Sequence, residues 1–187
     1  MTAIFKRELR SYFHGMMGYV LTAFLLADTG LYFLALNLGY GLTDFNYYTL
    51  YKTIFVLLIY FPVLTMRSLA EERHSRTDQL LLTNPVSVSG VVLGKFFAMC
   101  AVFAIPCLLD VVMILVLWGL GGTVSALIAN LAGLLCYFLM GCAAIAIGEF
   151  LSGLTENQII AAIMGFVVLL LAYLMPSLRS KIGRAHV

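Results

Sequence analysis

Charged side chains are scarce in this sequence: they make up 11% of its 187 residues, less than half of their share in an average soluble domain. Hydrophobic residues make up 63%, and the mean hydropathy is +1.02. This composition excludes a soluble globular protein, a disordered chain and a nucleic-acid-binding domain. It predicts an all-α polytopic membrane protein. At about 20 apolar residues per span, the length holds roughly five to six helices and leaves no room for a soluble catalytic domain.

Residues that bind metals or act as nucleophiles are also few. The sequence has three scattered histidines, and its four cysteines all lie in apolar stretches without CxxC spacing. Such cysteines are typical of small buried or lipid-facing residues rather than of a metal site or disulfide. A small membrane enzyme would need His, Asp or Ser clustered at one membrane depth, and we find no such cluster. We therefore expect no catalytic, cofactor or metal site in this chain. The cysteines are Cys100, Cys107, Cys136 and Cys142.

Five long apolar segments dominate the sequence. Hydrocarbon offers no partner to exposed backbone groups, so each segment must be a helix or a closed-barrel strand, and these are too long and too continuously apolar for strands. Lys52 can snorkel to the interface near one end of the second segment. The expected spans are residues 18–38, 47–66, 91–118, 126–151 and 156–176.

A basic amphipathic segment, residues 3–17, precedes the first span. Its apolar side chains recur at helical spacing on one face, and its basic side chains gather on the other. This pattern predicts a helix that lies in the membrane interface with its basic face toward anionic lipid. An ordinary cytoplasmic flank of the first span is the alternative. The basic residues are Lys6, Arg7, Arg10 and His14.

The positive charges predict the orientation. They lie in the amino-terminal segment and in the loop after the second span, whereas the loops after the first and third spans have none. The positive-inside rule then places the amino terminus and residues 67–90 in the cytoplasm of a multi-pass protein of the cell membrane. Five spans would leave the carboxyl end outside.

The last six residues, 182–187, have the sequence that a common sequencing adapter encodes in one reading frame. We expect them to be a non-native tail on a chain cut short in an outer loop, with one further span to follow. A genuine short polar tail is the alternative, and re-sequencing would decide between them.

Residues 67–90 form the one long polar stretch. Within it, the composition of residues 68–82 favours a helix in which acidic and basic side chains lie within reach of each other at helical spacing. A short charged amphipathic helix between two spans is suited to docking a soluble partner, and a solvated loop with weak surface ion pairs is the alternative. The charged residues are Arg67, Glu71, Glu72, Arg73 and Arg76.

Several short motifs carry a resemblance to a known family. The chain resembles the membrane permease subunit of ATP-binding-cassette exporters of the second type (ABC-2), near the branch linked to gliding motility. Met16 stands where such proteins often have proline, which leaves a kink before the first span unpredicted, and Arg76 stands where glycine is common. The matching motifs are Lys6-Arg7-Glu8-Leu9, Tyr12-Phe13, Gly18-Tyr19-Val20, Met66-Arg67, Ala70-Glu71-Glu72-Arg73, Leu80-Leu81-Leu82-Thr83, Pro85-Val86 and Gly94-Lys95-Phe96.

The resemblance implies a single permease domain over residues 1–181, with six spans in the complete protein, an interfacial helix and a cytoplasmic coupling helix. It implies that the coupling region, residues 67–90, fits a cleft on a separate ABC ATPase. Two ATPases then rock two permease subunits, as a homo- or heterodimer, between inward- and outward-open states. ATP and magnesium belong to the ATPase, because residues 90–96 lack the spacing and the Ser or Thr of a phosphate loop.

Ionisable residues inside a membrane are costly and suggest a function. Asp28 falls near the middle of the first span and Asp110 in the outer half of the third. We expect them either to line a substrate path or to form structural hydrogen bonds between helices. Glu149 lies near the end of the fourth span, from where it can snorkel to the interface.

Some signals concern packing and helix ends. Stripes of small residues, at residues 144, 148 and 152 and at 161 and 165, serve intramolecular packing or dimer contacts equally well. Pro62 and Pro106 are expected to kink spans two and three. Thr155 with Gln158 predicts a capping box at the start of the fifth span, and Asn84-Pro85 predicts the start of the third.

The substrate cannot be identified from the sequence. Besides a permease, a membrane anchor or assembly component without transport is compatible with it, and a small integral membrane enzyme is less so. An ATPase gene beside this one, and an ATPase that co-purifies, would favour the permease.

Overall fold

All regular structure in the described part of the chain is helical. The computed structural model describes residues 2–70 and 88–184, and their side chains over residues 4–70 and 89–175. Two of the segments, η1 and η2, are short π-helical stretches that flank the turn between the first two spans. In chain order the elements are α1 (Thr2–His14), α2 (Met17–Tyr32), η1 (Phe33–Leu38), η2 (Asn46–Leu50), α3 (Tyr51–Thr65), α6 (Val88–Gly119), α7 (Val124–Ser152) and α8 (Gln158–Arg184).

Five stretches of the described chain are long and apolar enough to cross a membrane. This confirms the predicted polytopic bundle, and every boundary lies within two residues of the expected one. The sixth span and the non-native tail stay predictions. The five spans are Met17–Leu38, Asn46–Thr65, Ser89–Gly119, Val124–Ser152 and Gln158–Met175.

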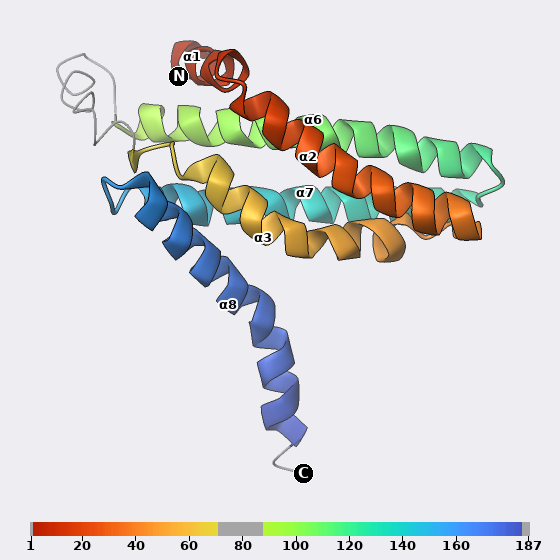
Figure 1. Cartoon of the computed structure of the whole chain (residues 1–187). Coiled ribbons are helices and arrows are strands. Elements are labelled where there is room, and N and C mark those ends of the chain that lie inside the picture. Colours follow the sequence, from red (N-terminus) through yellow and green to blue (C-terminus); the bar gives the residue numbers. More distant parts are fainter. Residues whose placement is uncertain (1, 71–87, 185–187) are drawn as a thin grey trace.

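Four of the spans form one bundle, and the fifth leaves it. Helices α6 and α7 run side by side, and α2 and α3 pack against them (Figure 1). Helix α8 begins against α3 and α7 and then diverges from the bundle. Only 17% of its apolar stretch Gln158–Met175 is buried, whereas 56% of the most apolar part of the span Asn46–Thr65 is buried. Most of the α8 surface is therefore left for lipid or for further protein.

The amino-terminal helix lies across the end of the bundle where α6 begins (Figure 1). It ends earlier than predicted because the chain bends at Gly15 and Met16, and Met16 adopts a left-handed conformation with φ of 50°. The bend occurs without proline. Gly18 then lets α2 pass close to α1, because a Cβ there would lie 2.9 Å from the carbonyl oxygen of Tyr12.

The caps of α7 and α8 come from polar side chains. Thr123 Oγ1 accepts the N–H of Ala126 at the start of α7. The predicted capping box at α8 is wrong: Asn157 Oδ1 accepts the N–H of Ile159, and Thr155 Oγ1 accepts the N–H of Asn157 instead. Asparagine is as good an N-cap as any residue, so it displaces a threonine two positions earlier. The predicted start at residues 84–85 lies outside the described residues.

The small-residue stripes pack within the chain. Gly148 lies against Thr65, and a Cβ at Gly148 would collide with that side chain. Gly165 lies against Pro62, with 3.5 Å between the Pro62 Cβ and an added Cβ. Both stripes are buried in this single chain. They therefore bring α7 and α8 close to α3. Of the two expected roles, packing within the chain and contact in a dimer, this is the first.

Candidate coupling site

Lys95 of α6 lies buried beneath the start of the coupling region. Its side chain, in a residue only 3% exposed, donates from Nζ to the carbonyl oxygen of Ser68 at 2.9 Å. Nζ also lies 3.4 Å from Glu8 Oε1 on α1. Gly94 makes this approach of α1 possible, because a Cβ there would lie 3.0 Å from a methyl group of Ile4. Two of the motifs that carried the family resemblance, one at residues 6–9 and one at 94–96, are therefore partners in space.

Glu149 of α7 is a third charged residue near Lys95 and Glu8. It is 4% exposed, and its carboxylate interacts electrostatically with Lys95 and with Glu8. The prediction that it snorkels to the interface is wrong, because α7 turns this face toward α6 rather than toward lipid. Arg7 adds a charge at the rim, 2.8 Å from Glu8 Oε1. We name Glu8, Lys95 and Glu149 the ionic cluster.

Ser152, at the end of α7, holds the chain as it enters the coupling region. Its Oγ accepts the N–H groups of Leu69 and Ala70, at 3.2 and 3.1 Å, and donates to the carbonyl oxygen of Met66 at 3.4 Å. Backbone N–H groups inside a protein need a hydrogen-bond partner, and a buried hydroxyl from a neighbouring helix can supply it. Ser152 and Lys95 together therefore clamp residues 66–70 to α6 and α7.

Of the predicted ATPase-contacting residues, the structure describes Arg67 alone. Its side chain is exposed beside the clamp, with Nη1 3.6 Å from Met17 Sδ. The other four, Glu71, Glu72, Arg73 and Arg76, lie outside the described residues, and their role stays a prediction.

The two predicted intramembrane acids belong to one buried polar cluster. Asp110 of α6 is 1% exposed and lies near the side chain of Thr29, the residue after Asp28 on α2. Asp28 lies near the side chain of Thr53 of α3. The hydroxyl of Tyr137, on α7, interacts electrostatically with both carboxyl groups. One oxygen of each carboxyl and the Tyr137 hydroxyl are buried without a hydrogen-bond partner. Four helices thus bring polar groups to one place.

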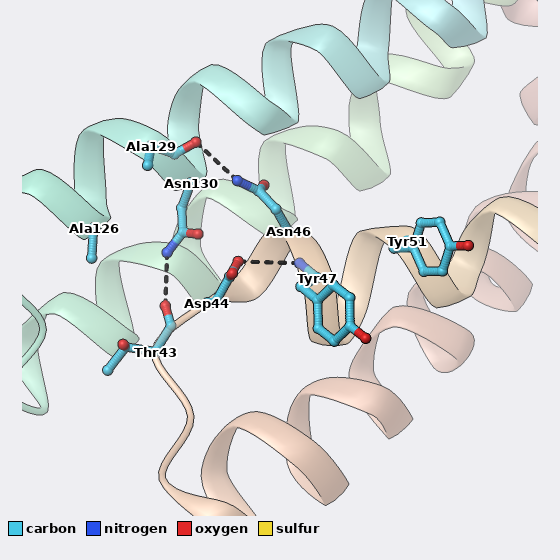
Figure 2. A pocket seen from close by; sticks show the side chains of 8 residues that line it. All are labelled: Thr43, Asp44, Asn46, Tyr47, Tyr51, Ala126, Ala129 and Asn130. Carbon is cyan, nitrogen blue, oxygen red and sulfur yellow. Dashed lines mark hydrogen bonds between the residues drawn. The ribbon is translucent and has the colours of Figure 1, made fainter.

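The far end of the bundle has a hollow that the sequence did not reveal. It measures about 470 Å³ and lies between η2 and the start of α7, at the end away from α1 (Figure 2). We name it the distal hollow. Its lining residues are Thr43, Asp44, Asn46, Tyr47, Tyr51, Ala126, Ala129 and Asn130.

Amide side chains fix the wall of the distal hollow. Asn130 is buried, accepts the N–H of Phe45 at 3.1 Å and donates to the carbonyl oxygen of Thr43 at 2.9 Å. Asn46 donates to the carbonyl oxygen of Ala129 at 2.9 Å (Figure 2). The loop before η2 is therefore anchored to α7 at several points. In the sequence, the signal for this anchor is an asparagine, Asn130, near the start of an otherwise apolar span.

Comparison with known proteins gives one match. Residues 17–179 match the family model described as ABC-2 family transporter protein. A search of curated proteins and a search of solved structures returned no match. The matched region includes all five spans, Lys95, Glu149, Ser152 and the entire coupling region. Because the match covers most of the sequence, the chain belongs to the ABC-2 family of membrane transporter proteins.

Proposed function

We propose that this chain is the permease subunit of an ABC exporter and moves its substrate across the cell membrane with ATP hydrolysed by a separate ATPase. Proteins of this family are transporters that generally work with an ABC ATPase, not classical enzymes. The observation that carries the proposal for this chain is the clamp. A segment that must pass force to the spans needs a rigid attachment, and Ser152 and Lys95 attach residues 66–70 to α7 and α6.

In this proposal the ATPase docks from the cytoplasm on the coupling region that begins at Arg67. ATP and magnesium stay on the ATPase. Movement of the coupling region pulls on Ser68 and on the two N–H groups held by Ser152, and so on α6 and α7. Through Glu8 the same movement reaches α1, which lies in the membrane interface. A second permease subunit completes the transporter.

Co-purification tests the docking. We expect an ATPase co-expressed with the tagged permease to be lost on charge reversal at three positions, Glu71→Lys, Glu72→Lys and Arg73→Glu. The matched control is Arg10→Glu, which reverses an exposed charge on α1 outside the coupling region and should retain the ATPase. Equal retention by both variants would refute docking through this region, and an ATPase that never co-purifies would favour the membrane-anchor alternative.

The polar cluster around Asp28 and Asp110 is proposed to line the substrate path. Its support is the burial of polar groups without partners between four helices, since such groups are costly in a membrane unless they serve a function. We expect Asp28→Asn and Asp110→Asn to reduce transport per folded molecule at least tenfold in the reconstituted complex. Glu156→Gln, an exposed acid in the connection between α7 and α8, is the control. Unchanged transport with reduced stability would assign the two acids to structure.

The most specific part of the proposal is that the chain belongs to the gliding-motility branch of the family. It is supported by the sequence motifs alone, and the substrate stays open. Deletion of the gene in a gliding host, with the cell speed on agar as the measurement, tests it. Unaltered gliding would leave the chain an ABC-2 permease with a different cargo.

A further inference from the structure

The distal hollow is acidic and aromatic. Among its lining residues Asp44 is a carboxylate, and none is basic. The rings of Tyr47 and Tyr51 are more than half exposed and lie parallel, with an interplanar angle of 4° and 6.1 Å between centroids. Every one of these groups favours a positive charge or a hydrogen-bond donor.

The Tyr51 ring already lies near one cation. Lys52 Nζ is 6.0 Å from its centroid, at the limit at which a cation is attracted by the face of an aromatic ring. Lys52 does not line the hollow. A carboxylate beside tyrosine faces is a common arrangement for recognition of ammonium groups, because the carboxylate attracts the charge and the rings bind the alkyl substituents as well.

We propose that the distal hollow binds an organic ammonium group. A volume of about 470 Å³ lies within the usual range of small-molecule sites and far exceeds a bare ion. The hollow lies where the spans beginning at Asn46 and Val124 start, so it opens at the level of the membrane interface. The ammonium group can therefore belong to a zwitterionic lipid or to a soluble amine. The proposal does not depend on the ATPase.

Calorimetric titration of the purified chain in an uncharged maltoside detergent tests the proposal. The probes are dihexanoylphosphatidylethanolamine, dihexanoylphosphatidylglycerol and free ethanolamine. We expect the ethanolamine lipid to bind about tenfold more tightly than the glycerol lipid, which has no ammonium group; this ratio corresponds to about 1.4 kcal/mol. Binding of free ethanolamine within threefold of the lipid would identify a soluble amine as the ligand, and weaker binding would identify the lipid headgroup.

Two variants locate the binding. Asp44→Asn removes the charge but keeps an oxygen to accept the N–H of Tyr47, the 3.1 Å bond that Asp44 makes now, so the fold is expected to persist. Tyr51→Leu removes one ring. Each should reduce the tenfold preference to less than threefold, whereas Tyr40→Leu, an exposed tyrosine outside the hollow, should retain it. If Asp44→Asn does not fold, the comparison of Tyr51→Leu with its control Tyr40→Leu tests the proposal. Equal binding of both lipids, or a preference that survives in Tyr51→Leu and in folded Asp44→Asn, would overturn the proposal.

Discussion

Replacement of Lys95 by methionine is the sharpest test of the ionic cluster. Methionine keeps the length of the side chain and removes the charge. Lys95 is 3% exposed and serves Ser68, Glu8 and Glu149. Removing one partner of a buried ion pair typically costs about 3–5 kcal/mol, because the remaining charge is left buried without compensation. We expect Lys95→Met to lower the free energy of unfolding by that amount.

Glu8 and Glu149 should contribute unequally to the free energy of unfolding that Lys95→Met removes. Glu8 retains Arg7 at 2.8 Å, and its side chain is 15% exposed, so water and arginine can replace the lysine. Glu149 is 4% exposed, and its Oε1 has no hydrogen-bond partner. Most of the cost should therefore come from Glu149. We expect the double variant Lys95→Met with Glu149→Gln to recover at least half of the loss, about 1.5–2.5 kcal/mol.

The measurement is unfolding by sodium dodecyl sulfate in mixed micelles, followed by circular dichroism. Lys52→Met is the matched control, because Lys52 is also a lysine within a span but is exposed, and it should change the free energy by less than about 0.5 kcal/mol. A Lys95→Met variant as stable as the Lys52→Met variant would refute the ionic cluster. A double variant no more stable than Lys95→Met would show that Glu149 is not the acid left uncompensated.

Three further substitutions test the contacts around this site and in the core. Ser152→Ala leaves two buried N–H groups without an acceptor, so we expect a loss of about 1–3 kcal/mol and faster proteolysis within residues 67–90. Gly141→Ala drives a Cβ into the Phe103 ring and should cost about 1–3 kcal/mol in the same unfolding assay, whereas Gly30→Ala, with open space, should not. Asn157→Ala should cost about 1 kcal/mol through the lost cap of α8, and Thr155→Ala should cost less.

The spans could be predicted from the sequence because one physical requirement governs them. A bilayer needs about 20 apolar residues per helix, and hydropathy measures this directly. The first span, expected over residues 18–38, is Met17–Leu38 in the structure. The bend before it could not be predicted, because methionine in a left-handed conformation has no sequence signal.

Most of the candidate site could not be predicted, because hydropathy does not show which way a helix faces. Helix α7 is apolar on nearly all sides, so the sequence does not tell whether Glu149 points to lipid or to Lys95. The contact between Glu8 and Lys95 joins residues that are far apart in the chain. The motifs at these two positions were recognisable, but only packing shows that they are partners. Asp28 and Asp110 were recognised because any acid in a span is conspicuous, and the structure supplied their common location.

Both ends of the bundle are held by hydrogen bonds, but only the coupling end adds an ionic contact, and this difference bears on movement. At the distal end, Asn46 and Asn130 hold the loop with neutral hydrogen bonds, which weaken steeply once distance or angle departs from the optimum. At the coupling end, Ser152 holds residues 66–70 with hydrogen bonds of the same neutral kind, and Lys95 adds an ionic contact with Glu8 whose attraction decreases only as the inverse of distance. A displacement of about 1 Å would break the neutral hydrogen bonds at either end and only weaken the ionic contact. The link from α6 to α1 through Lys95 and Glu8 is therefore suited to persist while the coupling end moves, as the proposed drive by an ATPase from the cytoplasmic side requires.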